Sequence, residues 1–211
     1  QGAAGNIDTY DFENDDAWGK DLSGYKRIGR IMAGEVIKII SSGYAGNEHD
    51  IKLQTENVTL QLPYKQLDER KVLDVISEWN SLSEEDKENL DFDKKAHDTR
   101  LMHLHDMIKK NGKHPTEISV VKINDLILVT IPGEYFVEYQ LELKKRFKQY
   151  RIIVMELTNG CSGYIPTKQA MALGGYEAVS SVFSNEAGTM ILEGITDIIN
   201  QMIGKHHYKE S

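Results

Sequence analysis

The order of apolar patterns between residues 117 and 203 constrains the fold of this chain more than any other feature. Three β-rich runs are interleaved there with two helical patterns, and Asn124-Asp125 between the first two runs is typical of a hairpin turn. Strands are expected at 117–123, 126–131 and 151–157, and helices from Glu134 and over 186–203. This succession predicts an α/β fold with a mixed β-sheet flanked by helices.

The first half of the chain is more polar and more helical. An apolar stripe at helical spacing follows Ser23 and ends at Ser41-Ser42-Gly43, which predicts one helix. Further elements are expected in this order: a hairpin over 51–62 that turns at Glu56-Asn57, a helix over 67–79, a charged helix from Ser83 to Lys110 that is interrupted near Asp91, and a turn over 111–115. We interpret residues 83–115 as a polar helical insertion in a chain, 1–211, that forms part of one domain.

Composition excludes several classes of protein. The 211 residues include 25 Lys and Arg against 33 Asp and Glu, a formal net charge of -8. Capture of nucleic acid needs Lys and Arg against phosphate, so this balance argues against a nucleic-acid partner. No run of about 18 apolar residues appears, so no transmembrane segment is expected. The single cysteine, Cys161, cannot form an internal disulfide.

Two residues that follow predicted strands are candidates for chemistry, because sites in open α/β sheets gather beyond the carboxyl ends of strands. Glu134 follows Pro132-Gly133 at the start of a predicted helix, where the helix dipole favours an ionised carboxylate. Tyr164 follows Gly160 and Gly163, which allow the backbone to turn a phenol into a cleft. On the pattern alone, the commoner explanations are a first-turn helix glutamate and a loop tyrosine.

Three further sets of residues have a functional and an ordinary interpretation. Asp8 could face a ligand from a loop of small residues, although a turn-stabilising role is the default. His103 and His105 lie two apart on a predicted helix and so on different faces, which predicts solvated side chains and no shared metal. Cys161 has no motif partner, and a small structural residue is the commoner explanation than a nucleophile.

Four motifs become specific when they are taken together. They are Gly-Ala-Ala-Gly-Asn-Ile-Asp at 2–8, Leu-Val-Thr-Ile-Pro-Gly-Glu-Tyr-Phe at 128–136, Asn-Gly-Cys-Ser-Gly-Tyr-Ile-Pro-Thr-Lys at 159–168 and Gly-Gly-Tyr-Glu at 174–177. In this order and spacing they resemble the neutral/alkaline (non-lysosomal) ceramidase family, in particular its shorter bacterial relatives. The resemblance covers 1–10 and 125–182 and fades over 45–115.

The resemblance implies a zinc-dependent amidohydrolase that cleaves an amide bond in a lipid-like or other small substrate. In the family, two His, a Glu and a Tyr hold zinc. Glu134 matches the Glu ligand, Tyr164 matches the Tyr ligand, and Tyr176 matches the tyrosine that donates to the developing oxyanion. Carboxylate oxygen and histidine nitrogen suit zinc, which lowers the pKa of bound water and polarises the amide carbonyl.

The sequence departs from the family pattern in two places. Asp8 stands where the family has a Ser, so we expect a carboxylate in the proton-handling position. The two His ligands lie upstream of this loop in the family, and none of the 7 histidines here has a matching context. We therefore expect the chain to be the C-terminal half of a larger α/β domain, with the N-terminal portion as its partner in cis or as a second chain. Secretion or a periplasmic location is what the resemblance favours.

Two other functions stay open at this stage. The first is a non-catalytic ligand-binding or scaffolding domain that kept the fold and lost the metal site. The second is a hydrolase that uses Cys161 as nucleophile, which requires a histidine brought beside it by the fold.

Overall fold

The structure of the chain is a computed structural model that describes residues 1–7, 10–11, 16–17, 22–43 and 50–207. The chain divides into two compact units, one formed by Ile7–Lys52 and the other by Gln1–Asn6 together with Leu53–Ser211. Asp8 lies outside the described residues.

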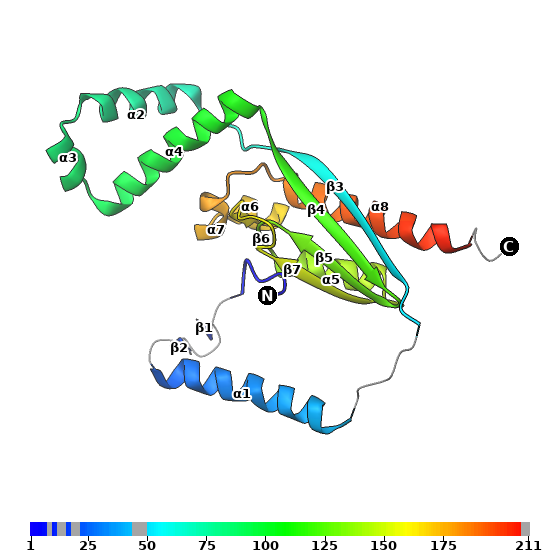
Figure 1. The fold of residues 1–211 in the computed structure, drawn as a ribbon. Helices are drawn as coiled ribbons and strands as arrows, with labels where there is room; N and C mark the ends of the chain where they lie inside the picture. The colour runs from blue at the N-terminus through cyan, green and yellow to red at the C-terminus, as the bar shows by residue number, and fades with distance from the viewer. Residues whose placement is uncertain (8–9, 12–15, 18–21, 44–49, 208–211) are drawn as a thin grey trace. The chain divides into compact units, whose positions relative to one another are not determined.

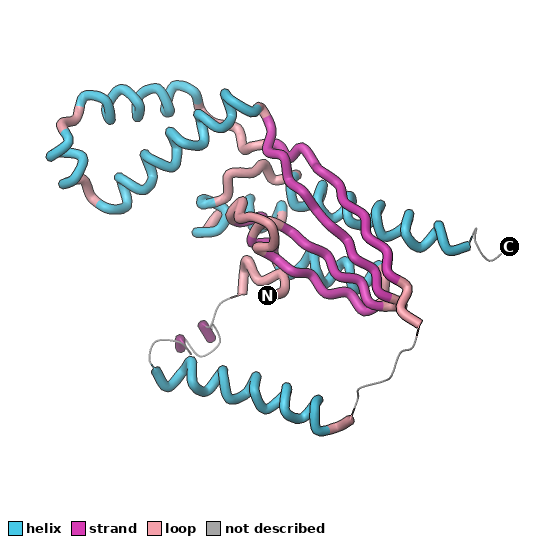
Figure 2. The backbone as a smooth tube through the Cα atoms, in the orientation of Figure 1, coloured by secondary structure: helices cyan, strands magenta, loops and turns pink. Residues whose placement is uncertain are grey.

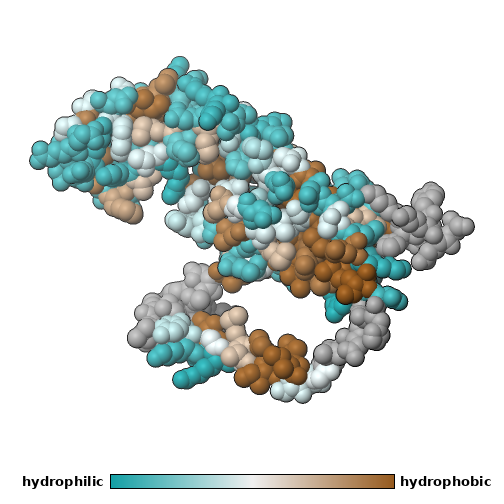
Figure 3. All heavy atoms as spheres, viewed as in Figure 1, coloured by the Kyte–Doolittle hydropathy of each residue, from teal (hydrophilic) through white to brown (hydrophobic). Residues whose placement is uncertain are grey.

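The smaller unit contains the predicted long helix, α1 (Leu22–Ser41), and two short antiparallel strands, β1 (Tyr10–Asp11) and β2 (Asp16–Ala17). The helix carries apolar side chains on its surface, among them Met32, Ile37 and Ile40, and part of it is coloured as hydrophobic in Figure 3. Among the described residues, none of the helices is both long and apolar enough to cross a bilayer.

A mixed four-stranded sheet forms the centre of the larger unit, which confirms the predicted α/β class (Figure 1). Its strands, in spatial order, are β3 (Leu53–Pro63), β4 (Lys113–Ile123), β5 (Leu126–Ile131) and β7 (Arg151–Glu156). The first three pair antiparallel, and β5 pairs parallel with β7. Figure 2 shows the four strands side by side.

Helices α5 (Val137–Arg146) and α8 (Ala187–His207) pack on this sheet and enclose the core. Alternate residues on the strands are buried, as the period of two along a strand requires. The core includes Ile118 and Val120 on β4, Ile127 and Val129 on β5, Ile152 and Val154 on β7, and Ile191, Ile195 and Ile199 on α8. Burial of this apolar surface is the main source of stability of the unit.

A helical arm, residues 69–111, connects β3 to β4 and projects beyond the end of the sheet in Figure 1. It contains α2 (Glu69–Ser81), α3 (Glu84–Asn89) and α4 (Phe92–Asn111). The capping box expected at Ser83 is present, with Asp86 as its partner, and the chain is interrupted before α4 near Asp91 as predicted. The visible surface of the arm is mainly hydrophilic (Figure 3).

Two local predictions in this region are wrong for a common reason. The expected hairpin at Glu56-Asn57 is absent, because residues 53–63 form one strand that pairs along its whole length with β4. The turn expected over 111–115 is limited to Gly112, since α4 ends at Asn111 and β4 already begins at Lys113. In both cases a long-range strand pairing overrides the local turn preference.

Candidate functional site

Glu134 and Tyr164 lie opposite each other on two short parallel strands, β6 (Glu134–Tyr135) and β8 (Tyr164–Ile165). The expected helix start at Glu134 is therefore wrong, and α5 begins only at Val137. The reason is a hydrogen-bond competition: the backbone N–H of Glu134 donates to the carbonyl of Gly163 at 2.9 Å and so joins a sheet instead of a helix. The helix-dipole argument for Glu134 does not apply.

The register of this strand pair sends the two candidate side chains to the same face. Successive side chains on a strand alternate in direction, and residues in register across parallel strands share a face. Tyr135 and Ile165, the next pair, are 0% and 1% exposed and point into the core. Glu134 and Tyr164 therefore point away from the core, where both are partly exposed.

Tyr176 joins these two side chains from a different element. It begins the short helix α7 (Tyr176–Ser180), which follows α6 (Lys168–Leu173) after a turn at Gly174 and Gly175. These two glycines have φ values of 83° and 102°, a region that residues with a Cβ rarely adopt. The Tyr176 ring meets the Tyr164 ring edge-on, with 5.8 Å between centroids and 75° between planes. The three residues are called the Glu-Tyr-Tyr site below.

Buried tyrosines and a serine fix the strands that carry the site. The Tyr135 hydroxyl donates to the carbonyl of Gly188 at 2.7 Å, and its ring stacks on Tyr139 at 4.4 Å. The Ser181 hydroxyl donates to the carbonyl of Tyr164 at 2.8 Å and ties β8 to the segment after α7. No local sequence pattern indicates these supporting residues, because their partners lie far away in the sequence.

The electrostatic environment of the site is negative. Burial raises the pKa of the Glu134 carboxyl, and the charge of Glu156 raises this pKa further. The pKa of the Tyr164 phenol is also raised, first by burial and then by Glu134 and the other acidic groups nearby. Within the described part of the chain, no Lys or Arg forms an ion pair with Glu134. A cation at this place would therefore meet a carboxylate and a phenol without a competing positive charge.

The segment Gln1–Asn6 lies along the other side of β6. The backbone N–H of Gly5 donates to the carbonyl of Tyr135 at 3.1 Å, and the backbone N–H of Val137 donates to Asn6 Oδ1 at 2.9 Å. A Cβ built on Gly5 would lie 2.4 Å from the carbonyl oxygen of Glu134, so only glycine allows this close approach. The described part of the loop expected to face a ligand, residues 2–6, therefore lies beside Glu134.

The other candidate residues do not join the site. Cys161 is exposed and free. His103 is exposed as expected, but His105 is only 8% exposed, so the prediction that it is solvated is wrong. It packs inside the arm, whose amphipathic helices need a buried face. Among the described residues, no three His, Cys, Asp or Glu side chains gather as a metal-binding group.

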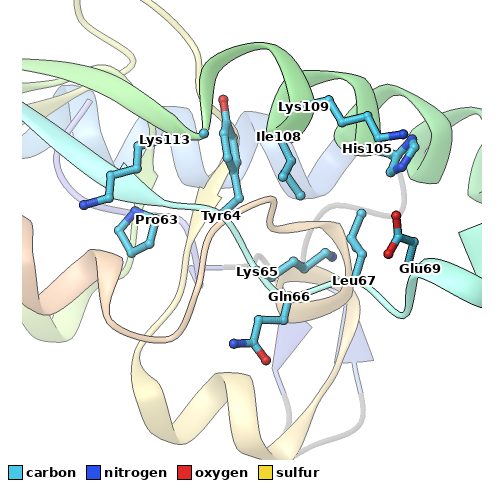
Figure 4. Close-up of a pocket in the computed structure, with 11 residues that line it drawn as sticks. Pro63, Tyr64, Lys65, Gln66, Leu67, Glu69, His105, Ile108, Lys109 and Lys113 are labelled. Atoms are coloured by element: carbon cyan, nitrogen blue, oxygen red, sulfur yellow. The ribbon is translucent and has the colours of Figure 1, made fainter.

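A cavity of 460 Å³ lies at the base of the arm (Figure 4). Its walls come from residues 63–69 and from the last turns of α4, and include Tyr64, Lys65, His105 and Ile108. Both ring nitrogens of His105 and the hydroxyl of Tyr64 are buried without a hydrogen-bond partner. The carboxylate of Asp106 lies 4.0 Å from His105 Nδ1, beyond hydrogen-bond distance.

Comparison with solved structures shows a fold similar to that of ceramidases. The neutral ceramidase from Pseudomonas aeruginosa aligns with a TM-score of 0.52 over 84% of this chain, at 11% sequence identity. A ceramidase complexed with C2 aligns over 36% of this chain and 13% of that chain, with a TM-score of 0.33 and 17% identity. This chain spans about a third (32%) of the length of the Pseudomonas protein. No protein-family model and no curated protein sequence matches the chain.

Proposed function

We propose that this chain is the C-terminal half of a ceramidase-like zinc hydrolase that cleaves the amide bond of an N-acyl compound, lipid-like or otherwise small. One observation carries the proposal: Glu134 and Tyr164 stand in register on adjacent strands, with the Tyr176 phenol against Tyr164. The similarity in fold to the neutral ceramidase from Pseudomonas aeruginosa supports it.

The donor atoms at the site suit half of a zinc coordination sphere. Glu134 offers a carboxylate oxygen and Tyr164 a phenolic oxygen from the same face of the strand pair. Burial raises the pKa of both groups, Glu156 raises that of Glu134 further and Glu134 raises that of Tyr164 further, and a bound divalent cation would lower both pKa values. Two histidines from the N-terminal portion, in cis or on a second chain, would complete four-coordinate zinc.

Zinc supplies an activated water and a polarised amide carbonyl when it is bound. The residues of this chain have separate tasks. Tyr176 donates a hydrogen bond to the oxygen on which negative charge develops, and its place at the tip of α7 leaves the phenol 67% exposed for a substrate. Asp8 stands where the family has a Ser, and its carboxylate would act there as a general base or hold a water.

The first experiment measures zinc in the complete protein, including its N-terminal portion. Glu134→Gln and Tyr164→Phe each remove one donor, so zinc affinity should fall by more than about 100-fold, the upper end of the loss seen for outer-shell partners. Glu85→Gln and Tyr150→Phe are matched controls elsewhere in the larger unit and should bind zinc normally. Normal zinc binding by both site variants would reject the proposed site, and a complete protein without zinc would favour a non-catalytic binding domain.

A second experiment separates catalysis from metal binding. Tyr176→Phe should retain stoichiometric zinc and lose roughly 10²–10³ in kcat towards N-acyl substrates, the effect of removing one oxyanion donor. An unchanged kcat would remove Tyr176 from the mechanism without affecting the metal site.

A further inference from the structure

Glu156 is a buried carboxylate at the end of β7, and it is 4% exposed. Its side chain accepts hydrogen bonds from the Gln1 amide and from the backbone N–H of Ala4 at 3.0 Å, and another from the backbone N–H of Tyr135 at 3.2 Å. Its own backbone N–H donates to the carbonyl of Gln1 at 3.2 Å. One side chain therefore bonds to both the first segment and β6.

These bonds hold the peptide group between Glu134 and Tyr135. The N–H of Tyr135 belongs to the peptide group that follows Glu134, so its bond to Glu156 fixes the orientation of that peptide. The N–H of Ala4 precedes Gly5, which packs directly on the carbonyl oxygen of the same peptide. A change at Glu156 would release both contacts together.

We propose that Glu156 is a positioning residue for Glu134, an inference that rests on the proposed function. Its carboxylate joins β6 to residues 1–4 and sets the direction in which the Glu134 side chain leaves the strand. Glu156 touches neither substrate nor metal in this account, and it acts through the hydrogen bonds that it accepts.

The hydrogen-bond pattern provides a specific test. Leucine at 156 removes both acceptor oxygens, so Glu156→Leu leaves the Gln1 amide and the backbone N–H groups of Ala4 and Tyr135 without their acceptor. Glutamine at 156 keeps the pattern, because its oxygen accepts from the two backbone N–H groups and its NH₂ group donates to the Gln1 amide oxygen once the Gln1 amide turns over. Function that is retained in Glu156→Gln and lost in Glu156→Leu distinguishes the hydrogen-bond pattern from a requirement for the negative charge.

Two readouts are compared in the complete protein. The first is hydrogen exchange of the backbone amides of Ala4 and Tyr135, which reports positioning without any need for zinc. The second is zinc affinity. Glu156→Leu should speed exchange at both amides and weaken zinc binding by about 10–100-fold, the usual effect of losing a group that orients a metal ligand. Glu156→Gln should retain both properties, and Glu142→Gln, a control on α5, should change neither.

Each outcome is decisive. Unchanged exchange and unchanged zinc affinity in Glu156→Leu would overturn the proposal. A Glu156→Gln variant with faster exchange at both amides and weaker zinc binding would also overturn it, including a case in which Glu156→Leu fails to fold. A third outcome is altered amide exchange in the variant together with no zinc binding by the unsubstituted protein. This outcome would overturn the proposal for Glu134 as a metal ligand and would reject the proposed function separately.

Discussion

Glu156 and the residues around it, Gln1–Gly5 and β6, are called the Glu156 corner. There a buried carboxylate accepts three hydrogen bonds, whereas at the base of the arm the buried imidazole of His105 has no partner for either nitrogen. A buried polar group with its bonds made specifies one arrangement of its neighbours. A buried polar group without them costs about 1–3 kcal/mol of stability. The comparison indicates that the corner is built for fixed geometry, and that the base of the arm retains His105 despite its energetic cost.

The packing around the two places differs in the same way. At the corner, the backbone of Gly5 touches the backbone of Glu134 with no room for a further atom. At the base of the arm, an open pocket of 460 Å³ lies beside His105. Close-packed interiors transmit displacement, so a small change at the corner should reach the Glu-Tyr-Tyr site, whereas a change beside the cavity can be absorbed locally.

The largest expected effect comes from Gly5→Ala. The new Cβ would lie 2.4 Å from the Glu134 carbonyl oxygen, so either the first segment or β6 has to move. Overpacking against backbone should lower the free energy of unfolding by about 3 kcal/mol, at the upper end of the usual range. Denaturant titration measures this loss. Gly2→Ala is the matched control, because its Cβ would meet only the end of the Gln140 side chain, at 3.1 Å.

If Gly5→Ala lowers the free energy of unfolding no more than Gly2→Ala does, the backbone at the corner accommodates an added Cβ as easily as the Gln140 side chain does. The contrast between the corner and the base of the arm would then disappear.

A smaller effect of opposite sign is expected for His105→Leu. Leucine removes the two unpaired nitrogens and keeps an apolar side chain of similar size in the packed arm, so the free energy of unfolding should rise by about 1–2 kcal/mol. His103→Leu, on the exposed face of the same helix, should be nearly neutral. A destabilised His105→Leu variant would mean that the imidazole has a partner in solution, such as ordered water in the cavity.

The sequence predicted the sheet and the core helices because they depend on local periodicity. The stripe from Phe136 to Phe147 and the runs that became β5 and β7 are each repetitive enough to specify their own form. The error at Glu56-Asn57 has the opposite origin, since the pairing that keeps β3 straight is made with residues about sixty positions later. Local turn preference carries no information about such a partner.

The candidate site was predictable in its residues but not in its geometry. Glu134, Tyr164 and Tyr176 came from motif order, and the structure brings them together. The strand at Glu134 pairs with a residue roughly 30 positions away, and the first segment contacts β6 roughly 130 positions away. No local pattern encodes either contact. Glu156 did leave a signal: it follows Ile152 and Val154 at a spacing of two, which places a charge on the buried face of its strand.

The smallest effect on stability is expected at His114. In its hydrogen bonding this histidine is intermediate between Glu156 and His105, because one of its ring nitrogens has a partner. Its Nδ1 pairs with the Thr116 hydroxyl at 3.1 Å, and its ring makes edge contacts with Tyr64 and Phe183. Burial lowers the pKa of this imidazole below the ordinary value of 6.5. In the unfolded chain the same group takes up a proton at higher pH than in the folded protein, so acidification favours unfolding.

The free energy of unfolding should therefore fall as pH drops through 6.5 and should level off below the folded-state pKa of His114. His114→Asn keeps a polar partner for Thr116 but does not titrate, so the slope of stability against pH in this range should become flatter. Denaturant titrations at several pH values between about 5 and 8 measure that slope. His103→Asn, which removes an exposed histidine, should leave it unchanged. If the slope survives in His114→Asn, another group is responsible for the pH dependence.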